Sequence, residues 1–266
     1  PYKHRIKFQS QSITRTTDLV MYDILGDSKD RNGDFAGVDI SSMLGKQSYK
    51  YGLTTENTDT LKPEVYYATV IPTAEQRDLG VAKYDKTAYE NDTNPNNPKN
   101  QGSIWKKWDV KNPKNNEKID RSQIKAIAID ARTTKAGERF ILDKEGMLAA
   151  YVEMTATTDM NKVSVKNTNT AFRTARIFAG AEPTESDVFD TVEAPSFHSI
   201  IEPVILSIPV KKQTVTPQGL SVPNIRNAFK FTLKGGLGAS LLDEKGQAIV
   251  TEKTNPDADG GLMEFG

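Results

Sequence analysis

The chain has 266 residues, with 35 basic and 35 acidic side chains and no cysteine. A formal net charge of zero argues against a nucleic-acid or membrane-surface partner, and the lack of cysteine excludes disulfide scaffolds, thiolate zinc sites and cysteine nucleophiles. No apolar run approaches the ~18 residues of a membrane span, and no basic-then-apolar leader opens the chain, so we expect a soluble protein.

The first part of the chain shows the period-two alternation that is typical of half-buried strands. Residues 2–8 alternate between one mainly apolar face and one basic face. The apolar face carries Tyr2, His4, Ile6 and Phe8. We predict further strands at 19–25 and 64–71, with a loop rich in Gly, Asp and Ser over 26–34. Residues 75–90 favour one short helix.

A polar segment follows. Eight of the 16 asparagines of the chain fall between residues 91 and 116, together with Pro, Lys, Trp105 and Trp108. Such a composition buries too little apolar surface to offset its ordering entropy, so we expect a surface loop over 91–118 that contributes little to stability and more to recognition. The two Trp side chains suit stacking on a sugar ring, and the alternative is that they anchor the loop to the domain.

Strand patterns return in the second half of the chain. They lie at 124–130, 140–142, 147–156, 163–165 and 171–177, and a second loop begins after Ala179. Residues 200–210 then read as the last strand of one domain continuing into the first strand of the next. From Pro209 only 58 residues remain, fewer than the ~100 of an immunoglobulin-like sandwich. We therefore predict an all-β protein of tandem immunoglobulin-like β-sandwich domains, 1–208 and 209–266, with the second one incomplete.

Residues for catalysis or metal binding are scarce. The two histidines, His4 and His198, lie near no nucleophile-elbow pattern, so we expect them to be surface or strand-facing residues. The acidic loop over 27–34 lacks the spacing and the terminal Glu of an EF-hand, which favours an acidic turn over a calcium site. We expect no enzyme activity, no metal and no cofactor.

One set of polar residues falls at core positions. Alternation places Asp23 on the same face as Leu19 and Met21. In the same way, Asn167 and Asn169 share a face with Val163 and Val165. Buried carboxylates and amides need partners, because each one left unpaired costs about 1–3 kcal/mol. Two interpretations remain open: a hydrogen-bond network that ties two strands, or a Lys–Asn isopeptide crosslink assisted by the carboxyl group.

Five runs of the first domain carry a resemblance to a known family. They are Tyr2–Lys7, Asp18–Leu25 with the loop to Gly37, Glu64–Thr69, Ile124–Asp130 and Phe140–Met154. Through them, residues 1–208 resemble stalk domains of large wall-anchored surface adhesins of Gram-positive bacteria. The related collagen-adhesin A-type domains imply that Asp23 is the catalytic acid of isopeptide formation and that Asn167 or Asn169 is the acceptor. In that family the reactive Lys lies on a strand before the one that matches Tyr2–Phe8, and we expect this sequence to begin too late to contain it. Lys3 and Lys7 fall on the outward face of their strand, so we do not assign the role to them.

The end of the chain resembles a second family. Its matching runs are Ile208–Lys212, Asn227–Leu233 and Leu241–Gly246. They are similar to the B-type and major-pilin domains of the same surface proteins, in which the opening strand carries a reactive Lys. Lys212 falls on the same face of its strand as Ile208 and Val210, so it is our candidate for the reactive, inward-facing Lys. Lys230 is expected to face water. The resemblance implies that the catalytic Glu and the acceptor Asn lie on strands beyond Gly266.

The combined interpretation is mechanical. We expect a stalk or shaft segment of an extracellular, wall-anchored surface adhesin or pilin, stabilised by Lys–Asn crosslinks, with neighbouring domains of the same protein as partners. The alternative is an adhesive module that binds a host glycan or protein through residues 91–118, with Trp105 and Trp108 as ligand-binding residues. An enzyme ranks third, because no acid–base pair suited to catalysis is evident, although two carboxylates in a cleft would serve a glycosidase.

Overall fold

The structure is a computed structural model that describes residues 2–44, 47–48, 54–55, 60–156, 167–194 and 197–199, together with short pieces between 214 and 254. The chain divides into two compact units, one of residues 1–157 and 164–201 and one of residues 158–163 and 202–266. Among the described residues, no helix is long and apolar enough to cross a membrane.

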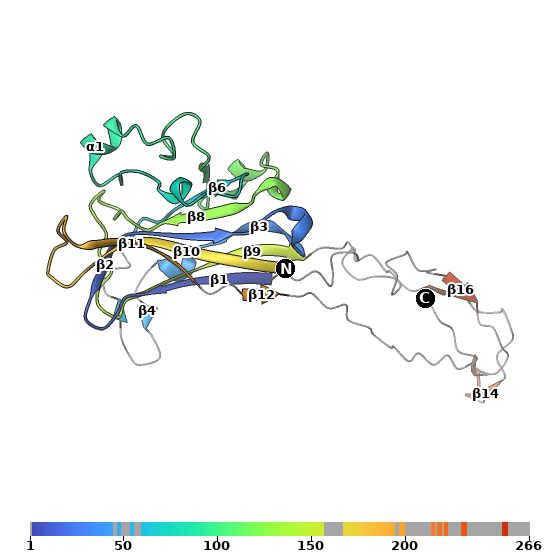
Figure 1. Ribbon diagram of the computed structural model, residues 1–266. Coiled ribbons are helices and arrows are strands. Elements are labelled where there is room, and N and C mark those ends of the chain that lie inside the picture. Colours follow the sequence, from blue (N-terminus) through green and yellow to red (C-terminus); the bar gives the residue numbers. More distant parts are fainter. Residues whose placement is uncertain are drawn as a thin grey trace. The chain divides into compact units, whose positions relative to one another are not determined.

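The first unit is built from two antiparallel sheets (Figure 1), which confirms the prediction of an all-β protein. The three-stranded sheet has the order β1 (Tyr2–Gln9), β9 (Met147–Ala156), β3 (Gly33–Asp39). The seven-stranded sheet runs β11 (Val188–Glu193), β10 (Asn167–Phe178), β2 (Arg15–Ile24), β8 (Ala126–Asp130), β6 (Glu64–Ala68), β7 (Lys106–Trp108), and β12 (Phe197–Ser199) pairs with β10. A separate short pair joins β4 (Gln47–Ser48) to β5 (Thr54–Thr55).

The main core lies between these two sheets. Burial along β1 alternates as predicted, with His4 and Ile6 buried and Lys3, Arg5 and Lys7 exposed. Leu19 and Met21 of β2 are each 1% exposed and belong to this core, as the parity of the strand predicted. Period two is visible in the sequence here because one face of β1 meets the core and the other meets water.

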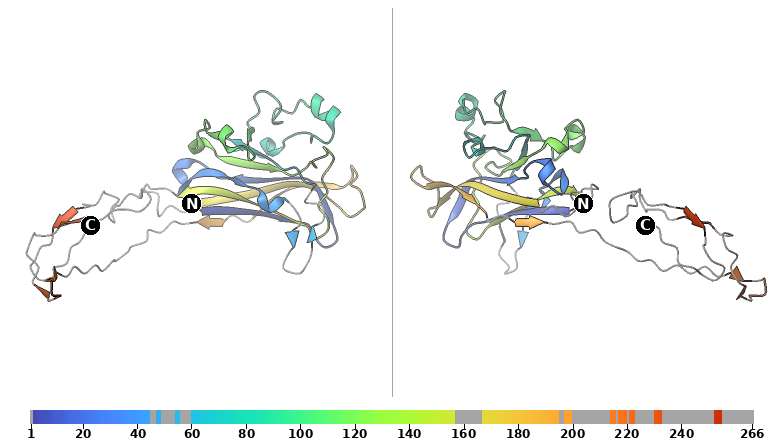
Figure 2. Two further views of the ribbon diagram at one scale, coloured as in Figure 1. Left: turned by 180° about the vertical axis from the view of Figure 1, so that it is seen from behind. Right: turned by 45° about the vertical axis from the view of Figure 1, so that its right-hand side comes forward.

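The central strand β2 departs from that simple pattern, because it is buried on both faces. Its other face contributes Val20 and Tyr22 to a second apolar cluster, which also contains Trp105 and Leu79. These last two come from the connection between β6 and β8, which carries α1 (Lys86–Asn91) and lies over this part of the sheet in all views (Figure 2). The seven-stranded sheet is therefore covered on its outer face by a long loop rather than left to solvent.

The helix predicted over 75–90 is only partly correct. The structure has a 3₁₀ turn, Glu75–Arg77, and the short helix α1, whose N-cap Asp85 accepts a hydrogen bond from the backbone N–H of Ala88. Between them Gly80 has a φ of +75°, which ends any continuous helix. Other 3₁₀ turns are Ser28–Asp30, Ser41–Met43, Pro113–Asn116 and Arg121–Gln123.

The segment after Ala179 was expected to be a loop, and this is wrong for residues 188–193, which form β11. The strand pairs with residues 172–177 of β10 along the edge of the sheet. Its side chains are mostly exposed, including Val188 at 64% and Phe189 at 51%. Because neither face of β11 is buried, it lacks the alternation from which a strand is recognised in a sequence.

In the second unit the described strands form two antiparallel pairs. β13 (Thr214–Val215) pairs with β14 (Ser221–Val222), and β15 (Lys230–Thr232) pairs with β16 (Glu252–Thr254). Lys230 is exposed, as expected. Lys212, Phe229, Leu233, the side chain of Phe231 and the hairpin predicted at 241–250 lie outside the described residues. The proposed boundary at 208/209 and the incompleteness of the second domain stay predictions.

Candidate functional site

Three buried polar side chains meet inside the first unit, each from a different strand. They are His4 of β1, Asp23 of β2 and Asn169 of β10, with exposed fractions of 4%, 1% and 0%. In the ladder between β2 and β10, Asp23 lies opposite Ala171. Asn169 is two residues from Ala171 and therefore on the same face of β10. His4 belongs to the opposite sheet, where it pairs with Val152 of β9.

The amide of Asn169 is the centre of this group. Its Nδ2 atom donates a hydrogen bond to Asp23 Oδ1 at 3.0 Å and lies 2.7 Å from His4 Nδ1. His4 Nδ1 is also 3.7 Å from Asp23 Oδ2. An amide nitrogen carries two hydrogens, so it can serve both acceptors if the imidazole is neutral with its proton on Nε2. This tautomer is assigned from the hydrogen-bond network.

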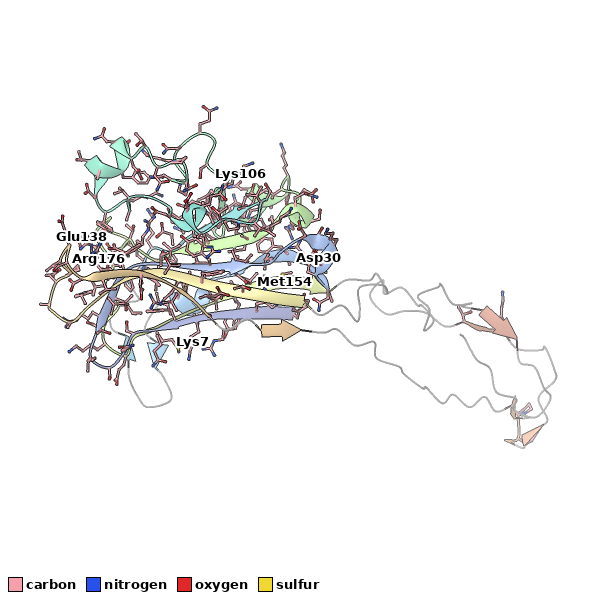
Figure 3. All side chains as sticks on the ribbon, in the orientation of Figure 1. Lys7, Asp30, Lys106, Glu138, Met154 and Arg176 are labelled. Atoms are coloured by element: carbon pink, nitrogen blue, oxygen red, sulfur yellow. The ribbon has the colours of Figure 1, made fainter. Side chains whose placement is uncertain are left out.

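These contacts confirm that Asp23 is buried and bonded to Asn169, whereas the crosslinking roles of the two residues stay predictions. Lys3 is exposed and pairs with Asp39 and Glu153, and Lys7 is exposed as well (Figure 3), which agrees with their outward parity. The other candidate acceptor, Asn167, pairs through its backbone with Ser199 of β12, and its side chain lies outside the described residues. Val163, Val165 and the candidate Lys212 also lie outside them.

The sequence left His4 as a surface or strand-facing residue, and the structure excludes the surface position, because His4 lies on the buried face of β1. A signal was present in the sequence, because His4 alternates in phase with Ile6 on the buried face of β1. The ring of Tyr2 lies beside the imidazole, with 5.3 Å between the two ring centroids. A histidine at a core position must find polar partners, and it finds Asn169 and Asp23.

The site can hold an amide in a fixed orientation with two acid–base groups on its nitrogen. Burial excludes water, so a carboxyl and an imidazole here compete little with solvent for hydrogen bonds. Asp23 Oδ2 makes no hydrogen bond among the described residues, which leaves one carboxylate oxygen able to bind a donor. Both groups accept from the same nitrogen, so the arrangement fixes the orientation of the Asn169 amide with a carboxyl and an imidazole beside its Nδ2 atom.

Trp105 and Trp108 are not exposed stacking platforms, and the ligand-binding role suggested for them is wrong in that respect. Their exposed fractions are 1% and 4%. Trp105 packs against Tyr22 at 5.6 Å between ring centroids and donates from Nε1 to the carbonyl oxygen of Gln76 at 2.7 Å. Trp108 packs edge-on against Phe35 at 4.9 Å. Both rings anchor the loop, which is the alternative that the sequence left open.

The asparagine-rich loop is held by its own polar side chains. Asp92 accepts hydrogen bonds from the backbone of Val81 and Asn94 and from the side chain of Asn97, all at 2.8 Å. Burial raises the pKa of Asp92, but these hydrogen bonds outweigh it and hold the pKa below its usual value. Asn97 and Asn116 are 0% and 2% exposed. The polar composition suggested a loosely held segment, but its Asp and Asn side chains form the hydrogen bonds that stabilise the turns of the loop.

A second polar group links this loop to the sheet. Glu64 of β6 accepts hydrogen bonds from Lys83, from Lys107 at 2.7 Å and from the Tyr66 hydroxyl at 2.7 Å. Burial raises the pKa of Glu64, but the three donors outweigh it and lower the pKa to about 2. An open cavity of about 270 Å³ lies beside it, lined also by Tyr89 of α1. Within the described residues these charges are paired, which indicates a structural role.

In the described part of the chain, no three His, Cys, Asp or Glu side chains gather in a way that could hold a metal ion. In the acidic loop over 27–34, Asp27 pairs with Lys125 at 2.6 Å, as an acidic turn would.

Comparisons with known proteins add little. No model of a known protein family matches the chain, and no curated protein matches it. Among solved structures, the chain is similar over 77% of its length, and over 84% of the other chain, to one described as "AvmM Catalyzes Macrocyclization in Alchivemycin A Biosynthesis", with 10% sequence identity and a TM-score of 0.23. A TM-score this low carries no argument about fold or function.

Proposed function

We propose that this chain is a load-bearing stalk or shaft segment of an extracellular bacterial surface adhesin or pilin, built from tandem immunoglobulin-like β-sandwich domains. The observation that supports the proposal best is the buried hydrogen bond between Asp23 and Asn169, at 3.0 Å. It joins strands that are far apart in the sequence, β2 and β10, and it lies in the core of the first unit. The same pair is what the resemblance to adhesin stalk domains implies for an isopeptide site.

The proposed crosslink is an amide between Asn169 and the side chain of a lysine. A neutral lysine amine attacks Cγ of Asn169, the new C–N bond forms, the Cγ–Nδ2 bond breaks, and Nδ2 leaves as ammonia. One proton moves from the amine to the leaving nitrogen, so no oxidant, reductant or cofactor is needed. Burial favours the neutral amine, and Asp23, with Oδ2 able to bind a donor, is suited to receive its proton.

A crosslink at Asn169 would matter mechanically. Hydrogen bonds between strands break one after another when a sheet is pulled along its edge, whereas an amide bond does not open under the same load. A protein without cysteine has no disulfide to serve this purpose.

The decisive test is the mass of the peptide that contains Asn169. The protein is purified from the cells that produce it and digested with a protease. We expect the Asn169 peptide to be joined to a lysine-containing peptide, with a combined mass lower by one ammonia. Asp23→Ala should abolish the link, and Lys3→Ala, an exposed residue of β1, should leave it intact. Recovery of the Asn169 peptide only in its linear, unmodified form would refute the crosslink.

The mechanical role needs a separate measurement. When the protein is pulled by its two ends in a single-molecule experiment, the residues enclosed by the crosslink should contribute no extension. Full extension of the chain at low force would contradict a stalk function. The alternative of an adhesive module at residues 91–118 is not proposed, because Trp105 and Trp108 are both buried.

A further inference from the structure

His4 makes a shorter contact with the Asn169 amide nitrogen than Asp23 does. The distance from Asn169 Nδ2 is 2.7 Å to His4 Nδ1 and 3.0 Å to Asp23 Oδ1. His4 also comes from the opposite sheet, so it approaches the amide from a different side. In amide transfer Nδ2 is the leaving atom, and an unprotonated amide nitrogen is a very poor leaving group. His4 Nδ1 is therefore placed where a proton is needed.

We propose that His4 is the general acid that protonates Nδ2 as ammonia departs. This inference rests on the proposed amide-forming function and adds a catalytic residue to it. The attacking amine gives its proton to Asp23 Oδ2. That proton passes to His4 Nδ1, which lies 3.7 Å from Oδ2, and then to Nδ2 as the Cγ–Nδ2 bond breaks. His4 and Asp23 end in their starting protonation states, and the net change is one proton moved from the amine to ammonia.

The groups that surround the imidazole in the described part of the chain include one that can pass it a proton. Among the described residues, the titratable groups that face His4 are Asp23 of β2 and the phenol of Tyr2 on its own strand. β9 presents Val152 opposite His4, and β10 presents Asn169, neither of which titrates. An imidazole can both accept and donate a proton through its ring nitrogens, which suits it to a proton relay.

A purely positioning role is the competing explanation, because His4 already accepts a hydrogen bond from the amide. The substitution His4→Asn separates the two roles. The amide of Asn can place an acceptor close to the position of imidazole Nδ1, so it can hold Asn169, but it does not titrate near neutral pH. A residue that only positions the amide should be replaceable in this way, and a proton donor should not.

The experiment follows ammonia loss with time. The full-length protein is produced in an unfolded, unreacted form, as inclusion bodies dissolved in denaturant, and its full starting mass is verified. It is then refolded at several pH values and quenched at intervals, and its intact mass is measured. We expect wild type and Lys3→Ala to lose one ammonia at equal rates, and His4→Asn to be slower by about 10²–10⁴-fold. The wild-type rate should also depend on pH, and the His4→Asn rate should depend on it less steeply.

Three results would overturn the inference. A His4→Asn protein that loses ammonia as fast as wild type removes His4 from the reaction while the proposed crosslink stands. A wild-type rate that is independent of pH does the same and requires no variant to fold. A wild-type protein that keeps its full mass overturns both the inference and the proposed function. Thermal unfolding of each variant is the control: a slow reaction counts against a variant only if that variant unfolds cooperatively, as the wild type does.

Discussion

The clearest stability prediction concerns Trp105, because the sequence and the structure lead to opposite expectations for it. The loop over 91–118 was expected to contribute little to stability. In the structure, Trp105 is 1% exposed and fills the apolar cluster on the outer face of the seven-stranded sheet. The substitution Trp105→Ala removes this indole and leaves Tyr22 without its ring partner.

The size of the effect follows from the contacts that are lost. Truncation of a buried Trp to Ala costs about 3–5 kcal/mol through lost apolar burial and the cavity left behind. The hydrogen bond from Nε1 to the Gln76 carbonyl, at 2.7 Å, is lost as well and adds about 1 kcal/mol. Together these terms give a loss of roughly 4–6 kcal/mol in the free energy of unfolding. At ~2–4 °C per kcal/mol for a unit of this size, the melting temperature should fall by at least about 8 °C.

Urea unfolding followed by circular dichroism provides the measurement. A matched control is Lys114→Ala, which lies on the same loop but is exposed, and which should change the free energy of unfolding by less than about 0.5 kcal/mol. If Trp105→Ala behaves like this control, the loop does not pack on the sheet as described and our reasoning about its anchoring is wrong.

Three further predictions test other parts of the first unit. Asp23→Ala removes an acceptor from the buried Asn169 amide and should cost about 1–3 kcal/mol in urea unfolding; a loss no larger than that of the exposed Lys3→Ala would contradict the network. The pKa of Glu64 is lowered from 4.5 to about 2 in the folded state, so its stabilising contribution is complete above pH 4.5 and is lost as the pH falls toward 2. Glu64→Gln should remove this part of the acid-induced loss of stability, and an unchanged pH dependence would argue against the paired carboxylate. Gly80→Ala and Gly137→Ala both carry the roughly 1–2 kcal/mol cost of a positive φ, but only at Gly80 would the new Cβ also clash with Asp92 Oδ2. Gly80→Ala should therefore lower the melting temperature further, and equal effects would show that the contact with Asp92 is not maintained.

Period-two alternation made part of the fold and part of the site predictable. β1 has one buried and one exposed face, so the alternation of apolar residues such as Ile6 with charged residues such as Lys7 identified both the strand and its buried face. The same phase placed Asp23 with Leu19 and Met21 in the core. Since a buried carboxylate requires a partner, a contact with a late polar residue could be anticipated before any coordinates were known.

Other features depend on contacts between distant parts of the chain and carry no local pattern. β11 is a strand because β10 offers it a hydrogen-bonding edge, and its exposed Val188 and Phe189 give no alternation to read. The outer face of β2 is buried because the loop that carries Trp105 folds back over it. Composition alone could not show this. The asparagine side chains of that loop form hydrogen bonds with the turns of the loop itself, although a polar composition suggests that they face water.

The sequence by itself determined the all-β class, the core-facing side of the early strands, and the presence of Asp23 at a buried position. Each of these follows from local chemistry, because residues two apart in a strand share a face whatever the rest of the chain does. Only the tertiary structure decided that Asn169 is the amide bonded to Asp23 and that His4 joins them. Those residues come from strands in two sheets, and the 2.7 Å and 3.0 Å contacts between them exist only once the sheets have packed.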